Sequence, residues 1–141
     1  MVSATEPQDI VDRVMTPTET GCLLENYAED VLDVLEELGH DYMPVVDGFA
    51  TRRPLGVVGR HELRQLVASD PGEARVAHVL LAGVPLIPLG THLTRLTQRL
   101  AEVPVALVVD HAGTLAGFLE IPRVLPWIMG VEPGQEGGAR A

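Results

Sequence analysis

Apolar residues along this chain form two kinds of pattern, one with a helical period and one typical of strands. Helical spacing is clearest over residues 28–38, where the apolar side chains fall on one stripe and Gly39 can end the helix in a left-handed conformation. Apolar runs at 42–47 and 55–58 are typical of buried strands, and the turn between them predicts an antiparallel hairpin. Apolar residues within 63–67 then predict a further helix.

The same order of elements occurs twice, in residues 9–69 (repeat 1) and residues 70–131 (repeat 2). Each repeat predicts a short helix, strand, helix, strand, strand and helix, and the anchors Asp47 and Asp110 lie 63 positions apart. A period of that length is too long for a solenoid repeat and indicates a duplicated supersecondary unit. In repeat 2 we expect Asp70 to cap the opening helix, with Pro71 at its first position.

The predicted fold class is α+β, with one module built from both repeats. A single repeat of about 60 residues buries too little apolar surface to be stable alone. We therefore expect the repeats to pack sheet to sheet around a shared core, related by a pseudo-two-fold axis. Residues 1–8 and 132–141 are expected to be disordered tails.

Charge and composition narrow the classes of partner. The net charge is −10, and all ten basic residues are arginine, which argues against binding duplex DNA or an anionic membrane surface. With 4% aromatic residues, little ring stacking is available for single-stranded nucleic acid. The sequence shows no signal peptide and no membrane-spanning run, and its single cysteine, Cys22, fits a reducing compartment, so a cytoplasmic location is expected.

Three words occur in order in repeat 1. Residues 11–17 read VDRVMTP, residues 43–47 read MPVVD, and residues 56–63 read GVVGRHEL. They resemble the V-x-x-V-M-T, L-P-V-V-D and G-(I/V)-(I/V)-(T/S)-x-R-D-L words of tandem CBS-domain pairs, also called Bateman modules. The resemblance covers about residues 10–130, and it implies two βαββα CBS repeats, each preceded by a short helix.

The resemblance also implies a function. Such pairs bind AMP, ADP, ATP or S-adenosylmethionine in clefts between the repeats, often form homodimeric discs of four repeats, and regulate a partner protein without catalysis of their own. We therefore expect a stand-alone regulatory module with no obligatory cofactor and an adenosine-type ligand. The alternative is a scaffold that has lost its ligand and serves only dimerisation or partner docking.

In the family, the hydroxyl of the last word holds phosphate, its aspartate holds the ribose hydroxyls, and apolar strand residues flank the adenine. Here Gly59 replaces the hydroxyl and Glu62 replaces the aspartate, with Arg60 and His61 between them. A hydrogen bond to a charged group contributes about 1.5–3 kcal/mol, so the substitution weakens the site, although glycine keeps its N–H and allows close approach. The candidate ligand-binding residues are Thr16, Thr18, Met43, Pro44, Val45, Gly56, Val57, Gly59, Arg60, His61 and Glu62.

Repeat 2 departs further from the pattern. Its last word, GFLEIPRV at 117–124, places Glu120 at the hydroxyl position and Arg123 at the carboxylate position. A carboxylate repels phosphate, so we expect no standard nucleotide site here and a local i,i+3 ion pair instead. In an inverted arrangement, Arg123 would hold the phosphate. The weaker second site comprises Leu107, Phe118, Glu120 and Arg123.

No constellation in the sequence predicts an enzyme. His61 and Glu62 begin a zinc-protease-like H-E-x-x-H word, but Gln65 replaces its second histidine, so no metal site is expected. Arg52 and Arg53 lie in a turn, where they are either solvated or reach a ligand or partner. Trp127, on the last helix, is expected in the core or at a dimer interface.

Overall fold

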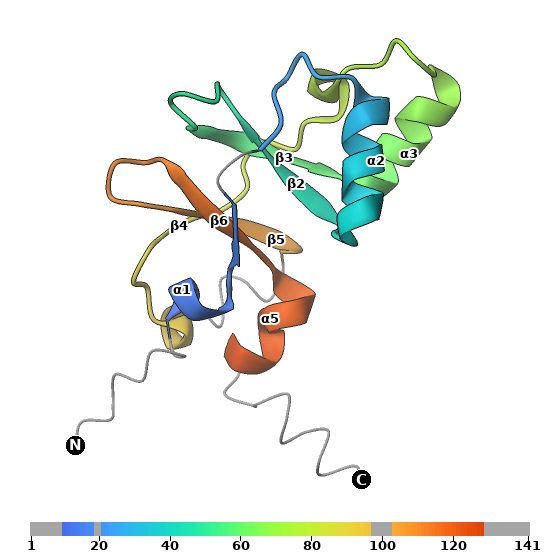
Figure 1. Ribbon diagram of the computed structural model, residues 1–141. Helices are drawn as coiled ribbons and strands as arrows, with labels where there is room; N and C mark the ends of the chain where they lie inside the picture. The colour runs from blue at the N-terminus through green and yellow to red at the C-terminus, as the bar shows by residue number, and fades with distance from the viewer. Residues whose placement is uncertain (1–9, 19–20, 97–102, 129–141) are drawn as a thin grey trace, which may run out of the picture.

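The computed structural model describes residues 10–18, 21–96 and 103–128, without the side chains of Thr94, Trp127 and Ile128. Both predicted tails lie outside the described residues. Repeat 1 contains α1 (Val11–Val14), β1 (Thr16–Pro17), α2 (Ala28–Leu38), β2 (Tyr42–Val46), β3 (Pro54–Gly59) and α3 (Arg60–Ser69) (Figure 1). Repeat 2 contains the 3-10 helix η3 (Val76–Val79), β4 (Leu86–Pro88), the 3-10 helix η4 (Leu93–Leu96), β5 (Val105–Val109), β6 (Leu115–Glu120) and α5 (Ile121–Ile128).

The two predicted hairpins are present, and they share one register. Strands β2 and β3 pair antiparallel with Tyr42 opposite Gly59, and β5 and β6 pair antiparallel with Val105 opposite Glu120. Because Gly59 and Glu120 each end the second strand of a hairpin, they are structural counterparts. The predicted end of α2 is also confirmed, since Gly39 caps it with a φ of 76°.

Each repeat sends its opening segment across to the other one. Strand β1 of repeat 1 pairs with β6 of repeat 2, with Thr16 opposite Phe118, so that the blue strand lies beside the orange one in Figure 1. In the opposite direction, Leu81 of repeat 2 forms an antiparallel bridge with Val57 of β3. The spatial units therefore differ from the sequence repeats. We call the body around β2, β3, α2 and α3 unit 1, and the body around β4, β5, β6 and α5 unit 2.

Glycine permits this exchange at equivalent places. A Cβ atom on Gly117 would lie 2.6 Å from the carbonyl oxygen of Thr16, and a Cβ atom on Gly56 would collide with the carbonyl of Leu81. Both contacts are with the backbone of the incoming segment, which cannot turn aside as a side chain can. The glycine that opens the last word of each repeat thus allows one strand to lie close against another.

Alternate strand residues face opposite layers, as expected for a sheet buried on both faces. Val45 and Val58 pack with the apolar faces of α2 and α3, whereas Val46 and Val57 pack against the second sheet. Their partners across the sheet interface are Val105, Leu107, Leu115 and Phe118. The four-stranded sheet has the order β1-β6-β5-β4. The predicted sheet-to-sheet packing is therefore confirmed, with helices on the two outer faces (Figure 1).

The start of repeat 2 differs from the prediction. Asp70 follows the end of α3, where its N–H bonds to the carbonyl of Leu66, and the opening helix is the 3-10 turn η3, which begins after Arg75. The predicted cap was wrong because α3 continues to Ser69 and uses Asp70 in its own last turn. Within the described residues, no helix is both long and apolar enough to cross a bilayer.

Candidate functional site

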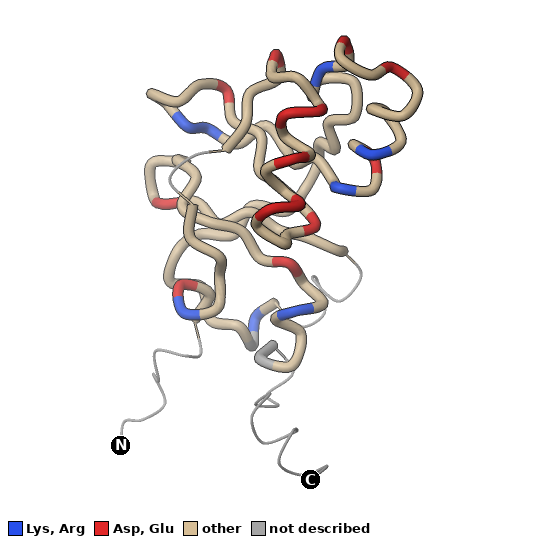
Figure 2. The backbone as a smooth tube through the Cα atoms, turned by 45° about the vertical axis from the view of Figure 1, so that its right-hand side comes forward, with Lys and Arg blue, Asp and Glu red and all other residues tan. Residues whose placement is uncertain are grey.

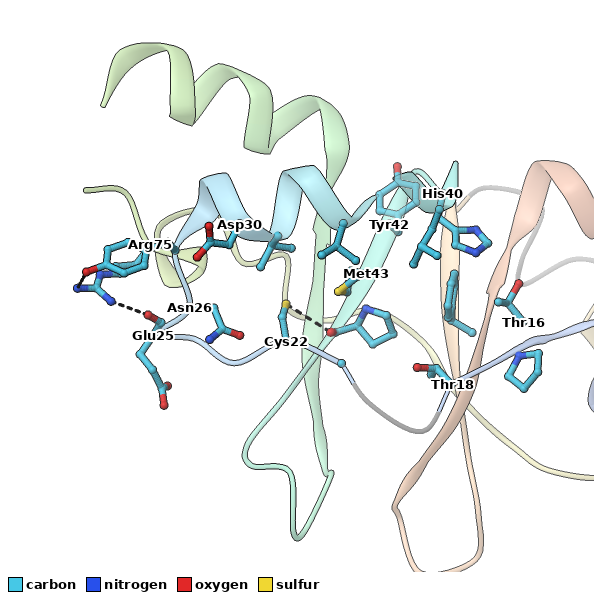
Figure 3. A pocket seen from close by; sticks show the side chains of 18 residues that line it. Thr16, Thr18, Cys22, Glu25, Asn26, Asp30, His40, Tyr42, Met43 and Arg75 are labelled. Carbon is cyan, nitrogen blue, oxygen red and sulfur yellow. Dashed lines mark hydrogen bonds between the residues drawn. The ribbon is translucent and has the colours of Figure 1, made fainter. Parts of the chain in front are cut away.

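An elongated cavity of about 710 Å³ runs between α2 and the place where β1 crosses β6. We call it the base-side hollow. Thr16 and Thr18 line it from the crossing segment, Met43 and Pro44 from β2, and Phe118 from β6 (Figure 3). These are five of the residues predicted for ligand contact, and they come from both repeats. Apolar walls with a few hydroxyl groups are typical of a small-molecule pocket.

The residues at the opposite end of this hollow were not among the predicted site residues. There the Arg75 guanidinium lies 3.9 Å from the centre of the Tyr27 ring and donates a hydrogen bond to the Glu25 carbonyl at 2.7 Å. The carboxylate of Asp30 lies nearby on α2 (Figure 3), and acidic residues follow that helix in Figure 2. Arg75 reaches this end through the bridge between Tyr27 and Arg75, a pairing that no local pattern announces.

Cys22 lines the middle of the base-side hollow but is itself buried. Its Sγ donates to the carbonyl of Pro44 at 3.6 Å, and burial raises the pKa of the thiol to about 12. A thiol with so high a pKa carries almost no thiolate at neutral pH and is unreactive. Cys22 therefore acts as a small buried hydrophobe.

A second hollow, of about 510 Å³, lies where β3 meets α3 and β6 meets α5. We call it the anion-side hollow. Gly59, Arg60, His61 and Glu62 line it from repeat 1, and repeat 2 contributes Glu120, Pro122 and Arg123. The last words of both repeats thus open into one space, as pseudo-two-fold symmetry requires.

Tyr42 lines both hollows and stands between them. Its ring lies close to Gly59, since a Cβ atom on that glycine would be 3.3 Å from ring carbon Cε1. Burial raises the pKa of the Tyr42 hydroxyl, and the nearby carboxylates of Glu62, Asp41 and Glu120 raise it further. The phenol therefore stays protonated and can donate a hydrogen bond to a group placed between the hollows.

The two departures in repeat 1 are coupled in space. The carboxylate of Glu62 folds back over Gly59, so that any Cβ atom there would collide with Oε1. The longer acid thus occupies the room that a serine or threonine would use. Arg60 holds Asp41 at 2.6 Å and keeps that carboxylate neutralised at the edge of the hollow.

Glu120 is the buried acid of the anion-side hollow, with 4% of its side chain exposed. Its Oε1 lies 3.4 Å from Arg123 Nη1 and 3.3 Å from His40 Nδ1. Its Oε2 accepts a hydrogen bond from the backbone N–H of Asp41 at 2.7 Å. The predicted i,i+3 pair between Glu120 and Arg123 is confirmed, but sequence analysis missed the two contacts with unit 1.

The remaining predicted site residues line neither hollow. Val45 belongs to the core beneath α2, and Val57 and Leu107 are fully buried between the sheets. Gly56 lies against the carbonyl of Leu81. These four residues pack in the core next to the residues that line the hollows. Their contact with a ligand stays a prediction.

The turn with the two arginines joins the two units. The Arg52 guanidinium donates hydrogen bonds to the carbonyls of Leu115 at 2.6 Å and Thr18 at 3.1 Å. Arg53 donates its backbone N–H to the Asp47 carboxylate at 2.9 Å. Arg52 therefore links the two sheets by hydrogen bonds. It is not a solvated loop residue, and it lines neither hollow.

Metal binding finds no support in the described part of the chain. No group of three or more histidine, cysteine, aspartate or glutamate side chains within it is arranged to hold a metal ion. His61 lies at the mouth of the anion-side hollow, beside arginines.

Two crossed hairpin units, packed sheet to sheet with a cleft between their last words, define the tandem CBS-domain pair, and this chain has that fold. The CBS domain of a bacterial CNNM/CorC family Mg²⁺ transporter, solved in complex with ATP, matches with a TM-score of 0.72 at 23% identity, covering 89% of this chain and 90% of that one. CBSX2 in complex with AMP matches with a TM-score of 0.65 at 23% identity, covering 86% and 96%.

A hemolysin-like protein containing a CBS domain, from Oenococcus oeni PSU, also has a TM-score of 0.72, at 15% identity over 88% of this chain and 94% of that one. No protein-family model and no curated protein sequence matches the chain. The resemblance inferred from the three words is thus confirmed at the level of the fold.

Proposed function

We propose that this chain is a regulatory CBS-pair module that binds an adenosine-type ligand through repeat 1 and modulates a partner protein. The observation that carries the proposal is that two hollows of different polarity lie on the two sides of Tyr42. On one side lies an apolar hollow with Thr16 and Thr18, and on the other lies a polar hollow with Arg60 and His61. An adenosine ligand has the same division, with an apolar base, a ribose and a charged end.

The predicted residues that line the hollows have separate roles in this arrangement. Met43, Pro44 and Phe118 offer apolar surface to the base, and the Glu62 carboxylate can accept hydrogen bonds from the ribose hydroxyls. The Arg60 N–H donates to the Asp41 carbonyl, so the next N–H groups of α3, with the Arg60 and His61 side chains, would bind the charged end. ATP and AMP complexes of two structures with the same fold support this class of ligand.

Regulation would follow from a shift of populations. The base-side hollow is lined from both repeats, so a ligand that fills it favours one arrangement of the two units over others. A partner, or a second copy in a homodimer, then distinguishes that arrangement.

The experiment is a thermal-shift screen with AMP, ADP, ATP and S-adenosylmethionine, followed by calorimetry. We expect at least one ligand to raise the melting temperature of the wild-type chain, and Glu62→Ala to abolish that rise. Glu37→Ala, an exposed acid on α2 that lines neither hollow, is the matched control and should keep it. The absence of heat and of a thermal shift with all four ligands at millimolar concentration would reject ligand sensing.

The competing function is a ligand-free interaction scaffold, and the coupled change at Gly59 and Glu62 favours it, because Glu62 fills the space of the lost hydroxyl. A scaffold would bind its partner or dimerise equally well with and without nucleotide. Sedimentation analysis of the chain in both conditions separates the two functions. An oligomeric state that responds to ligand supports sensing, and one that does not respond supports the scaffold.

A further inference from the structure

Glu120 stands where repeat 1 has Gly59. Both residues end the second strand of a hairpin and precede a helix, and they lie opposite equivalent partners, Val105 and Tyr42. In the pseudo-two-fold frame, the Glu120 carboxylate therefore occupies the place in unit 2 that the anionic end of a ligand would take. Its 4% exposure means that it is a fixed part of the cleft wall.

The groups around this carboxylate are those that bind phosphate in proteins. A backbone N–H, an imidazole nitrogen and a guanidinium surround it, from Asp41, His40 and Arg123. Charge-assisted hydrogen bonds of this kind hold carboxylate and phosphate oxygens alike. Arg123 is fixed by a further hydrogen bond to the carbonyl of Gly39 at 2.8 Å, and His40 packs edge-on against Phe118 with ring centres 5.4 Å apart.

The contacts also cross between the units. His40 and Asp41 belong to the loop between α2 and β2 of unit 1, about 80 residues before Glu120 in the chain. A buried carboxylate is costly to desolvate unless it is paired and hydrogen-bonded, so these partners must remain close to the Glu120 side chain. The carboxylate consequently joins the two units at the point where a bound anion would join them.

We propose that Glu120 is a built-in anion that occupies a phosphate-binding position formed by His40, the Asp41 N–H and Arg123. It closes the repeat-2 half of the cleft to phosphate and holds the two units together without a ligand. The position would accept inorganic phosphate or a phosphomonoester once the carboxylate is removed. This inference goes beyond the proposed function and does not require that nucleotide binds in repeat 1.

The test is Glu120→Ser, which removes the carboxylate and leaves a small hydroxyl at the position. In phosphate-free buffer we expect E120S to melt below the wild type, because the Asp41 N–H and His40 lose their hydrogen-bond partner and Arg123 loses its ion-pair partner. Added sodium phosphate, at constant ionic strength, should restore its melting temperature and leave the wild type unchanged. By calorimetry, E120S should bind phosphate at least about tenfold more tightly than the wild type, the effect of one charge-assisted hydrogen bond.

Two further variants identify the position. Adding Arg123→Gln to E120S should remove the gain in phosphate binding, and Glu120→Gln should be destabilised without rescue, because its amide still fills the space. If phosphate stabilises E120S no more than the wild type, or stabilises E120S and E120S/R123Q equally, Glu120 is only a structural ion-pair residue. An E120S chain that stays unfolded in phosphate would overturn the inference in the same way.

The outcome is separable from nucleotide sensing. Glu37→Ala in the E120S background should leave the phosphate effect intact, because Glu37 is exposed on α2 and lines neither hollow. A wild-type chain that binds no nucleotide, together with an E120S chain that binds phosphate, would reject the proposed function and keep this inference. A wild-type chain that binds nucleotide, together with an E120S chain that binds no phosphate, would keep the proposed function and reject this inference.

Discussion

The two halves of the anion-side hollow have the same backbone arrangement, but they place their acidic side chains differently. In repeat 1, the strand ends at Gly59, which has no side chain, and a carboxylate folds over it from Glu62 in the next helical turn. In repeat 2, the strand ends at Glu120, whose carboxylate points to partners in unit 1. Both halves therefore contain an acid near the proposed phosphate position, but only the acid of repeat 2 is buried at the strand end itself.

This difference shows which parts of a duplicated fold are free to diverge. The glycines that admit the crossing segments, and the aspartates that end the first strand of each hairpin, serve the same purpose in both repeats. The last strand residue is glycine in one repeat and a buried glutamate in the other. In our proposal, this residue decides whether the adjacent space is open to an anion.

The largest loss of stability is expected from substitutions at the two crossing-site glycines, where the repeats are most alike. Gly56→Ala and Gly117→Ala should each lower the free energy of unfolding by about 2–3 kcal/mol, because the new methyl group meets a backbone carbonyl and overpacking has costs of that order. Gly56 also has a φ of 157°, which adds strain for alanine. Urea denaturation measures both losses.

Gly48→Ala is the control for these two variants, since its nearest neighbour would be Thr51 Oγ1 at 3.5 Å. Its free energy of unfolding should change by less than about 0.5 kcal/mol. If only one of the two crossing-site glycines were sensitive, the exchange of segments would stabilise one unit alone, and the structural equivalence of the repeats would be contradicted.

The next largest effect is a change in nucleotide affinity when Gly59 and Glu62 of repeat 1 are substituted. Gly59→Ser restores the hydroxyl but places a Cβ atom against the Glu62 carboxylate, so alone it should not improve nucleotide binding. In the double variant Gly59→Ser/Glu62→Asp, the shorter acid withdraws, and affinity should rise about tenfold, as expected for a hydrogen bond to a charged phosphate.

Calorimetry with the ligand selected in the thermal screen measures this coupling, with Glu62→Asp alone as the matched control. A gain from Gly59→Ser that is the same with either acid at position 62 would show that the two changes are independent. The explanation of Gly59 as room for Glu62 would then be wrong.

Much of the fold was predictable because its signals are local. Gly39 and the apolar stripe of α2 predict that helix, and the apolar runs at 42–47 and 55–58, with counterparts at 105–110 and 114–119, predict the hairpins. The opening of repeat 2 was not, because Asp70 fits a helix start and a helix end equally well. The 3-10 turn η3 is instead fixed by long-range bonds, such as that from the Val76 N–H to the Asn26 carbonyl.

The candidate site was predictable only within each repeat. Sequence words located Thr16, Met43 and Glu62, which need only their own repeat to be recognised. Arg75 at the far end of the base-side hollow and the His40 contact of Glu120 depend on the crossing of segments between units. No periodicity records that crossing, so spacing alone could not reveal these partners.

The smallest expected effect compares the aspartates of the two hairpins. Asp47 accepts hydrogen bonds from the Thr51 hydroxyl and the Arg53 N–H, and Asp110 accepts from the N–H groups of Thr114 and Ala112. These bonds hold the pKa of each carboxyl below its ordinary value of 3.8, those of Thr51 and Thr114 contributing most.

Because the folded pKa is depressed, each aspartate stabilises the fold above pH 3.8, and that stabilisation is lost as the pH falls through the folded pKa. Asp47→Asn and Asp110→Asn should therefore lower the melting temperature slightly and equally at pH 7, and the difference from the wild type should close below pH 3.8. Asp33→Asn, on the exposed face of α2, is the matched control. Melting curves across the acid range up to neutral pH decide the matter: unequal losses would show that the two turns have diverged as the strand ends have.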